Sequence, residues 1–345
     1  MTVQPDFTTA LAREAYEAPS AAERQINRHR RAFSDLGRRL RAQPPRFVVT
    51  CARGSSDHAA SYGKYLIEAF LGKAVASVGP SVASLYDTCL DLRDALFIVV
   101  SQSGRSPDLL RAVERAREGG ALVVGFVNDE TSPLPALCDV CLPLSAGPEV
   151  SVAATKSYIL SGLAFLSLVA HWSQSEDLLD AVEALPTALE AARDLDWRPV
   201  FDSLVLARSL FVIGRGYGLG AAQEMALKFK ETCRIHGEAF SAAEVFHGPL
   251  ALVGPELPVL ALGQGDPSAA TTRQAVARIV GLGGIVWSVL DVEGAGRLPG
   301  VPDVPAVLAP LCELQSFYMS LPHLIAARGL PVDAPAHLNK VTETL

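Results

Sequence analysis

The sequence predicts an α/β fold in which two doubly wound parallel sheets follow one another along the chain. Its 345 residues suit two domains of about 100 to 200 residues each. Apolar residues make up 49% of the chain and charged residues 19%, which is enough for two large cores. Short apolar segments alternate with longer helical ones, and the whole alternation occurs twice.

The predicted strands of the two halves share one spacing. The strand Phe47–Cys51 runs into Gly54, and Leu210–Ile213 runs into Gly216, 162 residues further on. Two more pairs have the same offset, Leu96–Val100 with Pro258–Leu262 and Leu122–Asp129 with Gly284–Asp291. Because short buried strands joined by helices form parallel sheets, we predict an internal duplication, with domains at 46–195 and 196–345.

Residues 1–45 form a helical, arginine-rich lead-in that ends at Pro44-Pro45 and is too short for its own core. A solvated helix face explains these arginines better than a nucleic-acid contact does, because the net charge of the chain is −7. The same net charge argues against duplex DNA as a partner.

A long apolar helix is predicted to close each half, at Val152–Trp172 and at about Leu314–Ala327. The apolar surface of such helices has to be buried against other protein, and we expect this burial between the halves or in a dimer interface. Lys156 and several serines interrupt the first one, so it is not predicted to span a membrane. The start of the chain has no pattern typical of a signal peptide, and the six cysteines are widely spread, so a cytoplasmic location is expected.

Serine-rich loops follow two predicted strands of the first half. Ser55 and Ser56 follow the first strand, and the second leads into Ser101-Gln102-Ser103-Gly104-Arg105-Ser106, with Ser106 as a candidate N-cap. A single serine-rich loop usually only caps the N-terminus of the helix that follows it. Two at the carboxyl ends of neighbouring strands favour a phosphate site, because hydroxyls and helix N-termini attract anions. The second half has Gly263-Gln264-Gly265-Asp266 instead, where the aspartate would repel phosphate.

The second half carries candidate catalytic side chains. Glu224, Lys228 and Glu231 share one face of a predicted helix, either as a functional cluster or as a surface ion-pair ladder. His247 precedes a Gly-Pro turn, with Glu238 and Glu244 nearby, and either a catalytic or a structural role fits it.

Two other motifs have simpler explanations. Gly216-Tyr217-Gly218-Leu219-Gly220-Ala221 fits a dinucleotide loop, but Gln264 lies where a ribose-binding acid would be needed, so NAD is disfavoured. The pair Cys138 and Cys141 has no second pair, and alternate positions on a strand explain it better than zinc.

Six sequence blocks in order resemble the double sugar-isomerase (SIS) family, which includes the isomerase part of glucosamine-6-phosphate synthase and the SIS-type glucosamine-6-phosphate deaminases. The resemblance runs from about residue 46 to 345. The blocks are Cys51-Ala52-Arg53-Gly54-Ser55-Ser56, Ser101-Gln102-Ser103-Gly104, Ala153-Ala154-Thr155-Lys156, Ala226-Leu227-Lys228-Phe229-Lys230-Glu231, His247-Gly248-Pro249-Leu250 and Leu338-Asn339-Lys340-Val341-Thr342.

The resemblance implies flavodoxin-like domains and a role for each matching residue. Glu231 matches the carboxylate that moves a proton between C1 and C2 of the open sugar. His247 matches a ring-opening histidine supplied by the neighbouring subunit of a homodimer, and Lys340 matches a lysine that forms a Schiff base. No metal or organic cofactor is implied, and Ala154 departs from a serine of the synthase. The sugar-phosphate site is implied to contain Ser55, Ser56, Ser101, Gln102, Ser103, Ser106, Val152, Glu224 and Lys228.

The function expected from this resemblance is an aminosugar-6-phosphate deaminase/isomerase that converts glucosamine 6-phosphate to fructose 6-phosphate and ammonia. The expectation of ammonia release rests on the start of the chain, which has no glutaminase domain before the lead-in. The alternatives are an aldose-ketose phosphosugar isomerase, an ammonia-dependent synthase-like isomerase, and a non-catalytic sugar-phosphate sensor. SIS-type sensors carry an added DNA-binding domain that residues 1–45 are too short to supply.

Overall fold

The computed structural model describes residues 8–340, which form two compact units. Of the described residues, the first-sheet unit contains 20–149, 156–184 and 339–340. The second-sheet unit contains 8–19, 150–155 and 185–338. Each unit therefore contains segments that are far apart in the sequence.

The first-sheet unit is built on five parallel strands in the order β2-β1-β3-β4-β5. The chain moves outward in one direction from β1 to β2 and in the other from β3 to β5, so the sheet is doubly wound, as predicted. The switch point lies between β1 and β3. The strands are β1 (Phe47–Cys51), β2 (Val75–Ser77), β3 (Ala95–Ser101), β4 (Leu122–Val127) and β5 (Val140–Pro143).

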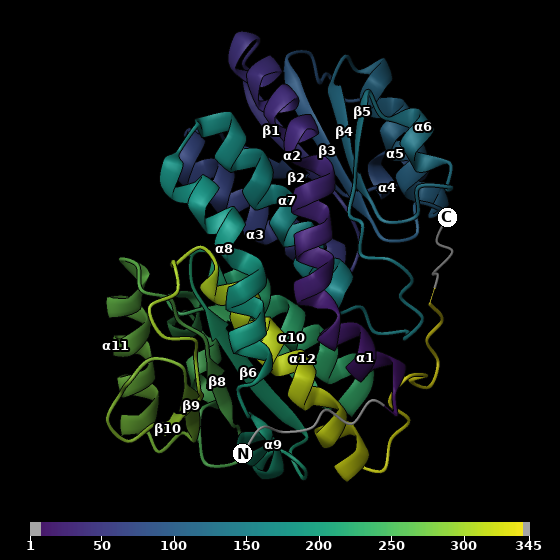
Figure 1. The fold of residues 1–345 in the computed structure, drawn as a ribbon. Coiled ribbons are helices and arrows are strands. Elements are labelled where there is room, and N and C mark those ends of the chain that lie inside the picture. The colour runs from purple at the N-terminus through teal and green to yellow at the C-terminus, as the bar shows by residue number, and fades with distance from the viewer. Residues whose placement is uncertain (1–7, 341–345) are drawn as a thin grey trace. The chain divides into compact units, whose positions relative to one another are not determined.

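Helices cover both faces of this sheet (Figure 1). On one face, Phe97 and Val99 of β3 share a core cluster with Val113. On the other, Phe126 makes an edge-to-face contact with Phe165, with ring centroids 5.1 Å apart. The first face is covered by α4 (Ser81–Ser84), α5 (Pro107–Glu118) and α6 (Leu134–Leu137), and the second by α2 (Ala18–Ala42), α3 (Ser55–Leu71) and α7 (Lys156–Ser173).

The apolar helix predicted from Val152 begins at Lys156, because residues 150–155 form an irregular loop. It packs against α3 within the first-sheet unit. Its apolar surface is thus covered inside this unit.

The second-sheet unit repeats the same plan. Its parallel strands have the order β10-β9-β8-β6-β7. In this order, β6 and β7 correspond to β1 and β2 of the first sheet, and β8, β9 and β10 correspond to β3, β4 and β5. The shared strand order agrees with the predicted duplication. The strands are β6 (Ser209–Gly214), β7 (His236–Ser241), β8 (Val259–Ala261), β9 (Val286–Ser288) and β10 (Gly296–Arg297).

Helices again lie on both faces of the sheet (Figure 1). The side chains of Val276 and Ile279 from α11 (Ser268–Gly281) pack on Ile213 and Val259. The rings of Phe201, Phe229 and Phe317 cluster on the opposite face and come from α9 (Arg198–Ser203), α10 (Gly218–Cys233) and α12 (Ala309–Ala327).

The second apolar helix, α12, begins five residues earlier than predicted and packs within its own unit against α1 (Ala10–Tyr16), α9 and α10. The helix α8 (Glu176–Arg193) and the short 3-10 turns η1 (Glu244–Phe246) and η2 (Pro249–Leu252) complete the elements. None of the helices in the described part of the chain has the length and apolarity to cross a membrane.

Candidate functional site

Two serine-rich loops lie side by side at the carboxyl ends of neighbouring strands in the first sheet. The strands β1 and β3 are parallel neighbours, so the loops that follow them start side by side. Helix α3 begins at Ser55 and α5 begins at Pro107. Arg53, in the first loop, donates from Nη2 to Asp108 Oδ2 at 2.7 Å, which joins the two loops directly. The N-terminal ends of two helices therefore lie at the carboxyl ends of neighbouring strands.

Hydrogen bonds within the second loop shape it for this position. The Ser101 hydroxyl accepts from the Gly104 backbone N–H at 2.9 Å. Gly104 has φ +61°, and a Cβ at this residue would lie 2.0 Å from Ser132 Oγ, so the turn requires glycine. Ser106 occupies the N-cap position of α5, as predicted, but its hydroxyl makes no capping hydrogen bond. That hydroxyl has no partner among residues 8–340 and remains available to a ligand.

The matching loop of the second sheet is already occupied by the chain's own carboxylate. Asp266 Oδ1 accepts from the Ser268 backbone N–H at 2.8 Å, at the start of α11. Gln264 is buried and donates to the carbonyl oxygen of Arg215 at 2.7 Å. An internal anion and a buried amide thus fill the place that is open in the first sheet.

Close packing explains Gly218 of the dinucleotide-like motif and Gly214 just before it. A Cβ at Gly214 would lie 2.4 Å from the carbonyl oxygen of Gly218, and a Cβ at Gly218 would lie 3.0 Å from Gln264 Oε1. The two glycines therefore allow β6, the turn and Gln264 to approach one another.

The structure places only one cysteine of the C-x-x-C motif on a strand. Cys141 lies in β5, but Cys138 is the C-cap of α6, so alternate strand positions were the wrong explanation. Burial raises the pKa of Cys138 to about 12 and that of Cys141 to about 11. Within residues 8–340, no cluster of three or more His, Cys, Asp or Glu side chains is arranged to hold a metal ion.

A buried charge cluster lies on α10. Lys228 Nζ is 3.1 Å from Glu224 Oε1 and 2.6 Å from Glu231 Oε2. The Tyr318 hydroxyl of α12 also donates to Glu224 Oε1, at 3.0 Å. The side chains of Glu224 and Lys228 are 0% and 1% exposed, so the alternative of a surface ladder is wrong.

The cluster presents one carboxylate to the outside. Burial by itself would lower the pKa of Lys228, but Glu224 and Glu231 raise it well above its ordinary value, so the ammonium stays charged. Glu231 is 23% exposed and borders a cavity of about 350 Å³. The cavity is lined on its other side by the segment 330–338. Glu231 is therefore a reachable carboxylate beside a fixed positive charge.

His247 follows η1 and is exposed to solvent. Its backbone N–H donates to the Glu244 carbonyl oxygen at 2.9 Å, whereas its ring has no side-chain partner within the described chain. Glu238, on β7, and Glu244 are exposed too. The structure does not bring these three side chains into contact with the α10 cluster.

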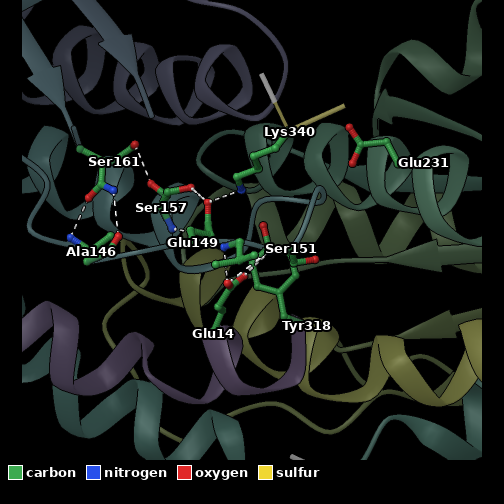
Figure 2. Close-up of polar contacts among 12 residues, drawn as sticks. Glu14, Ala146, Glu149, Ser151, Ser157, Ser161, Glu231, Tyr318 and Lys340 are labelled. Atoms are coloured by element: carbon green, nitrogen blue, oxygen red, sulfur yellow. Dashed lines mark hydrogen bonds and ion pairs between the residues drawn. The ribbon is translucent and has the colours of Figure 1, made fainter. Parts of the chain in front are cut away.

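The N-terminal helix α1 holds the irregular loop that contains Val152. The Glu14 carboxylate accepts from the backbone N–H groups of Val150 and Ser151 (Figure 2). The Val152 N–H donates to the Asp333 carbonyl oxygen at 3.2 Å, and the Asp333 carboxylate accepts from the first N–H groups of α1. Sequence reasoning missed Glu14 and Asp333, because their partners lie more than 130 residues away.

Lys340, the last described residue, pairs with a buried carboxylate. Its Nζ donates to Glu149 Oε2 at 3.2 Å (Figure 2). The same carboxylate accepts from the backbone N–H and the hydroxyl of Ser157, at 3.1 and 2.7 Å, in the first turn of α7. Glu149 was not predicted. Val341 and Thr342, the end of the last matching block, lie outside the described residues.

The predicted site residues thus fall into two groups. The first-sheet unit holds Lys340 and the loops with Ser55, Ser56, Ser101, Gln102, Ser103 and Ser106. The second-sheet unit holds Val152, Glu224, Lys228, Glu231 and His247.

A family model described as the SIS domain matches residues 44–171 and 203–291, once over each sheet. The chain belongs to the SIS domain family. Glutamine–fructose-6-phosphate aminotransferase [isomerizing] of Thermococcus kodakarensis is 33% identical over 99% of the chain. The chain spans 59% of that relative's length.

Solved structures of other proteins have the same fold. A candidate phosphosugar isomerase from Silicibacter pomeroyi superimposes with a TM-score of 0.89 at 40% identity, over 93% of this chain and 99% of that one. Glucosamine-6-phosphate deaminase from Thermotoga maritima superimposes with a TM-score of 0.72 over 94% of this chain and 100% of that one. At 21% identity, this second likeness shows the fold alone.

Proposed function

We propose that this SIS protein is a phosphosugar isomerase that transfers a proton between C1 and C2 of an open-chain hexose 6-phosphate. The observation that carries the proposal is the α10 cluster, in which a partly exposed Glu231 lies 2.6 Å from the buried ammonium of Lys228. A sensor that only binds sugar phosphate has no need of this arrangement, and burying charges is costly.

The residues divide the reaction into binding and chemistry. The hydroxyls and helix N-termini of the first-sheet loops bind the phosphate. Glu231 accepts the proton from one carbon of the substrate and returns it to the other, through an enediol or enolamine. His247 opens the sugar ring, and the Lys340 amine forms an imine with the ketose, with loss of water.

The finer proposal concerns the sugar and its amino group. We infer that the substrate is glucosamine 6-phosphate and that the products are fructose 6-phosphate and ammonia. This inference is supported by the relative from Thermococcus kodakarensis, whose name combines fructose 6-phosphate, an amino transfer and an isomerisation. The likeness to the candidate phosphosugar isomerase from Silicibacter pomeroyi favours a second candidate, an aldose-ketose isomerisation without ammonia.

The experiment is to incubate the purified protein with glucosamine 6-phosphate and to measure fructose 6-phosphate and ammonia in the same sample. Equal amounts of both products support the deaminase. Conversion of glucose 6-phosphate and fructose 6-phosphate into one another, without any ammonia from the amino sugar, supports the plain isomerase instead. A protein that binds sugar phosphates and turns over none of them contradicts both.

A Glu231→Gln variant tests the proton transfer. The amide keeps the size of the side chain but removes the base, so turnover should fall by about a hundredfold to ten-thousandfold while sugar-phosphate binding is retained. Glu238→Gln is the matched control, because Glu238 is an exposed glutamate on the neighbouring β7. Normal turnover by Glu231→Gln would remove Glu231 from the mechanism.

A further inference from the structure

Arg53 lies between the end of β1 and the start of α3, at the sheet edge where we propose that phosphate binds. Its Nε and Nη2 both donate to Asp108 Oδ2, at 3.0 and 2.7 Å. The Asp108 side chain is fully buried, whereas the Arg53 side chain is 49% exposed. One edge of the guanidinium is therefore fixed inside the protein, and the rest is open to solvent.

The open part of this guanidinium has unused donors. Nη1 donates to no group within the described chain, and a guanidinium carries five N–H groups in a rigid plane. Such a plane can bind two phosphate oxygens at once. The bond to Asp108 holds the plane in one orientation, so little entropy is lost when a ligand binds.

The charges around the two helix N-termini make a cation necessary there. Asp57 lies in the first turn of α3 and Asp108 in the first turn of α5, so both carboxylates would oppose a bound anion. Arg105, the other arginine of these loops, already donates to Asp129 at 2.8 Å. Arg105 is thus held by the loop after β4, whereas Arg53 is held by the first turn of α5 and is the arginine that lies between the two helix N-termini.

We propose that Arg53 is a substrate-binding residue that donates to a dianionic phosphate ester from the part of its guanidinium not bonded to Asp108. The proposal rests on the proposed function, since it adds a residue to the same phosphate site. It explains why a loop rich in neutral hydroxyl groups would select a phosphorylated sugar over the free sugar.

A purely structural role has to be separated from this one. In an Arg53→Met variant, Asp108 would remain as a buried negative charge without its arginine, and this charge weakens phosphate binding by itself. The double variant Arg53→Met/Asp108→Asn removes this charge as well. Arg53→Lys keeps the positive charge but lacks the planar fork.

The experiment measures binding of fructose 6-phosphate and of inorganic phosphate to the full chain by calorimetry, with melting temperature as a check of folding. We expect Arg53→Met and the double variant to bind about tenfold to a hundredfold more weakly than wild type, and Arg53→Lys to be intermediate. The control is Arg93→Met, because Arg93 also pairs with an aspartate but precedes β3 at the opposite edge of the sheet.

Recovery of wild-type affinity in the double variant would overturn the proposal, since Arg53 would then serve only to neutralise Asp108. Wild-type affinity in a folded Arg53→Met or Arg53→Lys protein would overturn it too, and with normal turnover the proposed function would stand. A wild-type protein that binds neither probe and turns over no sugar phosphate would contradict the proposed function itself, together with this residue's role in it.

Discussion

Glu231 and Lys228 lie one helical turn apart on α10, but their surroundings differ. The ammonium of Lys228 is buried and contacts two carboxylates, whereas Glu231 borders a cavity. Burying a charge costs several kcal/mol unless it is paired, and the buried Glu224 provides this pairing for Lys228 inside the protein. Glu231 is the carboxylate of this cluster that a ligand can reach.

Glu149 has a similar role for Lys340, because its carboxylate is the acceptor for the Lys340 ammonium. In a Glu149→Gln variant, an oxygen remains for Ser157 but the charge that holds the ammonium is lost. We expect borohydride trapping of fructose 6-phosphate on Lys340 to fall about tenfold, the usual effect of losing a charge-assisted hydrogen bond. Mass spectrometry of the trapped adduct measures this.

Lys340→Met should give no adduct at all, and Glu183→Gln, which alters an exposed ion pair with Arg30, should behave as wild type. Trapping should be measured at several pH values. Wild-type trapping by Glu149→Gln throughout that range would show that Glu149 does not position the lysine.

Glu313 is a second buried carboxyl group, with no opposite charge beside it. Its Oε1 accepts from the Gly263 N–H at 3.1 Å, and its Oε2 is buried without a partner within the described chain. Burial raises its pKa to about 8, an effect that the hydrogen bond from Gly263 only partly offsets. The side chain is therefore protonated in the folded protein at neutral pH.

This raised pKa predicts a pH-dependent cost in stability. The unfolded chain loses the Glu313 proton above about pH 4.5, while the folded protein keeps it up to about pH 8, so the free energy of unfolding falls between these values. At pH 7 the cost is about 3 kcal/mol. Glu313→Gln should therefore raise the melting temperature at pH 8 but change it little at pH 4.5. An equal shift at both pH values would contradict the assignment.

Two equivalent helices illustrate how an element gains or loses a ligand site. Both α5 and α11 follow the third strand position of their sheets, after β3 and β8. The N-terminus of α11 is satisfied by Asp266, whereas the Ser106 hydroxyl at α5 caps nothing. At α5 the chain's own carboxylate, Asp108, accepts from the Leu109 N–H at 2.8 Å but is paired with Arg53, whereas Asp266 has no arginine among the hydrogen-bond donors described for it.

This difference predicts opposite effects of two substitutions. Ser106→Ala should weaken sugar-phosphate binding but leave stability within about 0.5 kcal/mol, because no capping bond is lost. Asp266→Ala should cost about 1 kcal/mol in stability, the usual net value of a lost hydrogen bond, without changing that affinity. Calorimetric titration and chemical unfolding measure the two quantities. The assignment fails if Ser106→Ala destabilises and binds normally.

At the scale of the whole molecule, the two units share one strand order but have exchanged segments of chain. The N-terminal helix α1 belongs to the second-sheet unit, and residues 339–340 belong to the first-sheet unit. Each half therefore depends on chain that a cut at residue 195 would remove from it. His247, the exposed histidine without a ring partner, is the proposed catalytic residue that would act on a neighbouring copy.

Mixed dimers test that arrangement. If His247 completes the site of a neighbouring subunit, dimers of a His247→Ala chain with a Glu231→Gln chain contain one site with both residues intact. Since one of its two sites is intact, we expect a mixed dimer to have about half the activity of a wild-type dimer, while either variant alone stays inactive. Lack of recovery in confirmed heterodimers would show that each site uses the histidine of its own chain.

Much of this architecture follows from local pattern. The apolar runs ended where the strands end, to within a few residues, because a strand buried on both faces has to be apolar throughout. The fixed offset of 162 residues identified the duplication, and β6, β8 and β9 lie within or beside the expected segments. The helices that began at Lys156 and Ala309 were misplaced by four and five residues, since apolar composition does not distinguish a helix from a buried loop next to it.

The sequence by itself determined the fold class, the doubled sheet and the serine loops at the carboxyl ends of β1 and β3, because strand, turn and cap preferences act over a few neighbouring residues. Only the tertiary structure decided that Lys228 is buried, that Arg53 bonds to Asp108, that Glu14 holds the loop at Val150, and that Glu149 pairs with Lys340. Burial and ion pairing depend on which segments meet in space, and residues more than 50 positions apart leave no periodic signal of their contact.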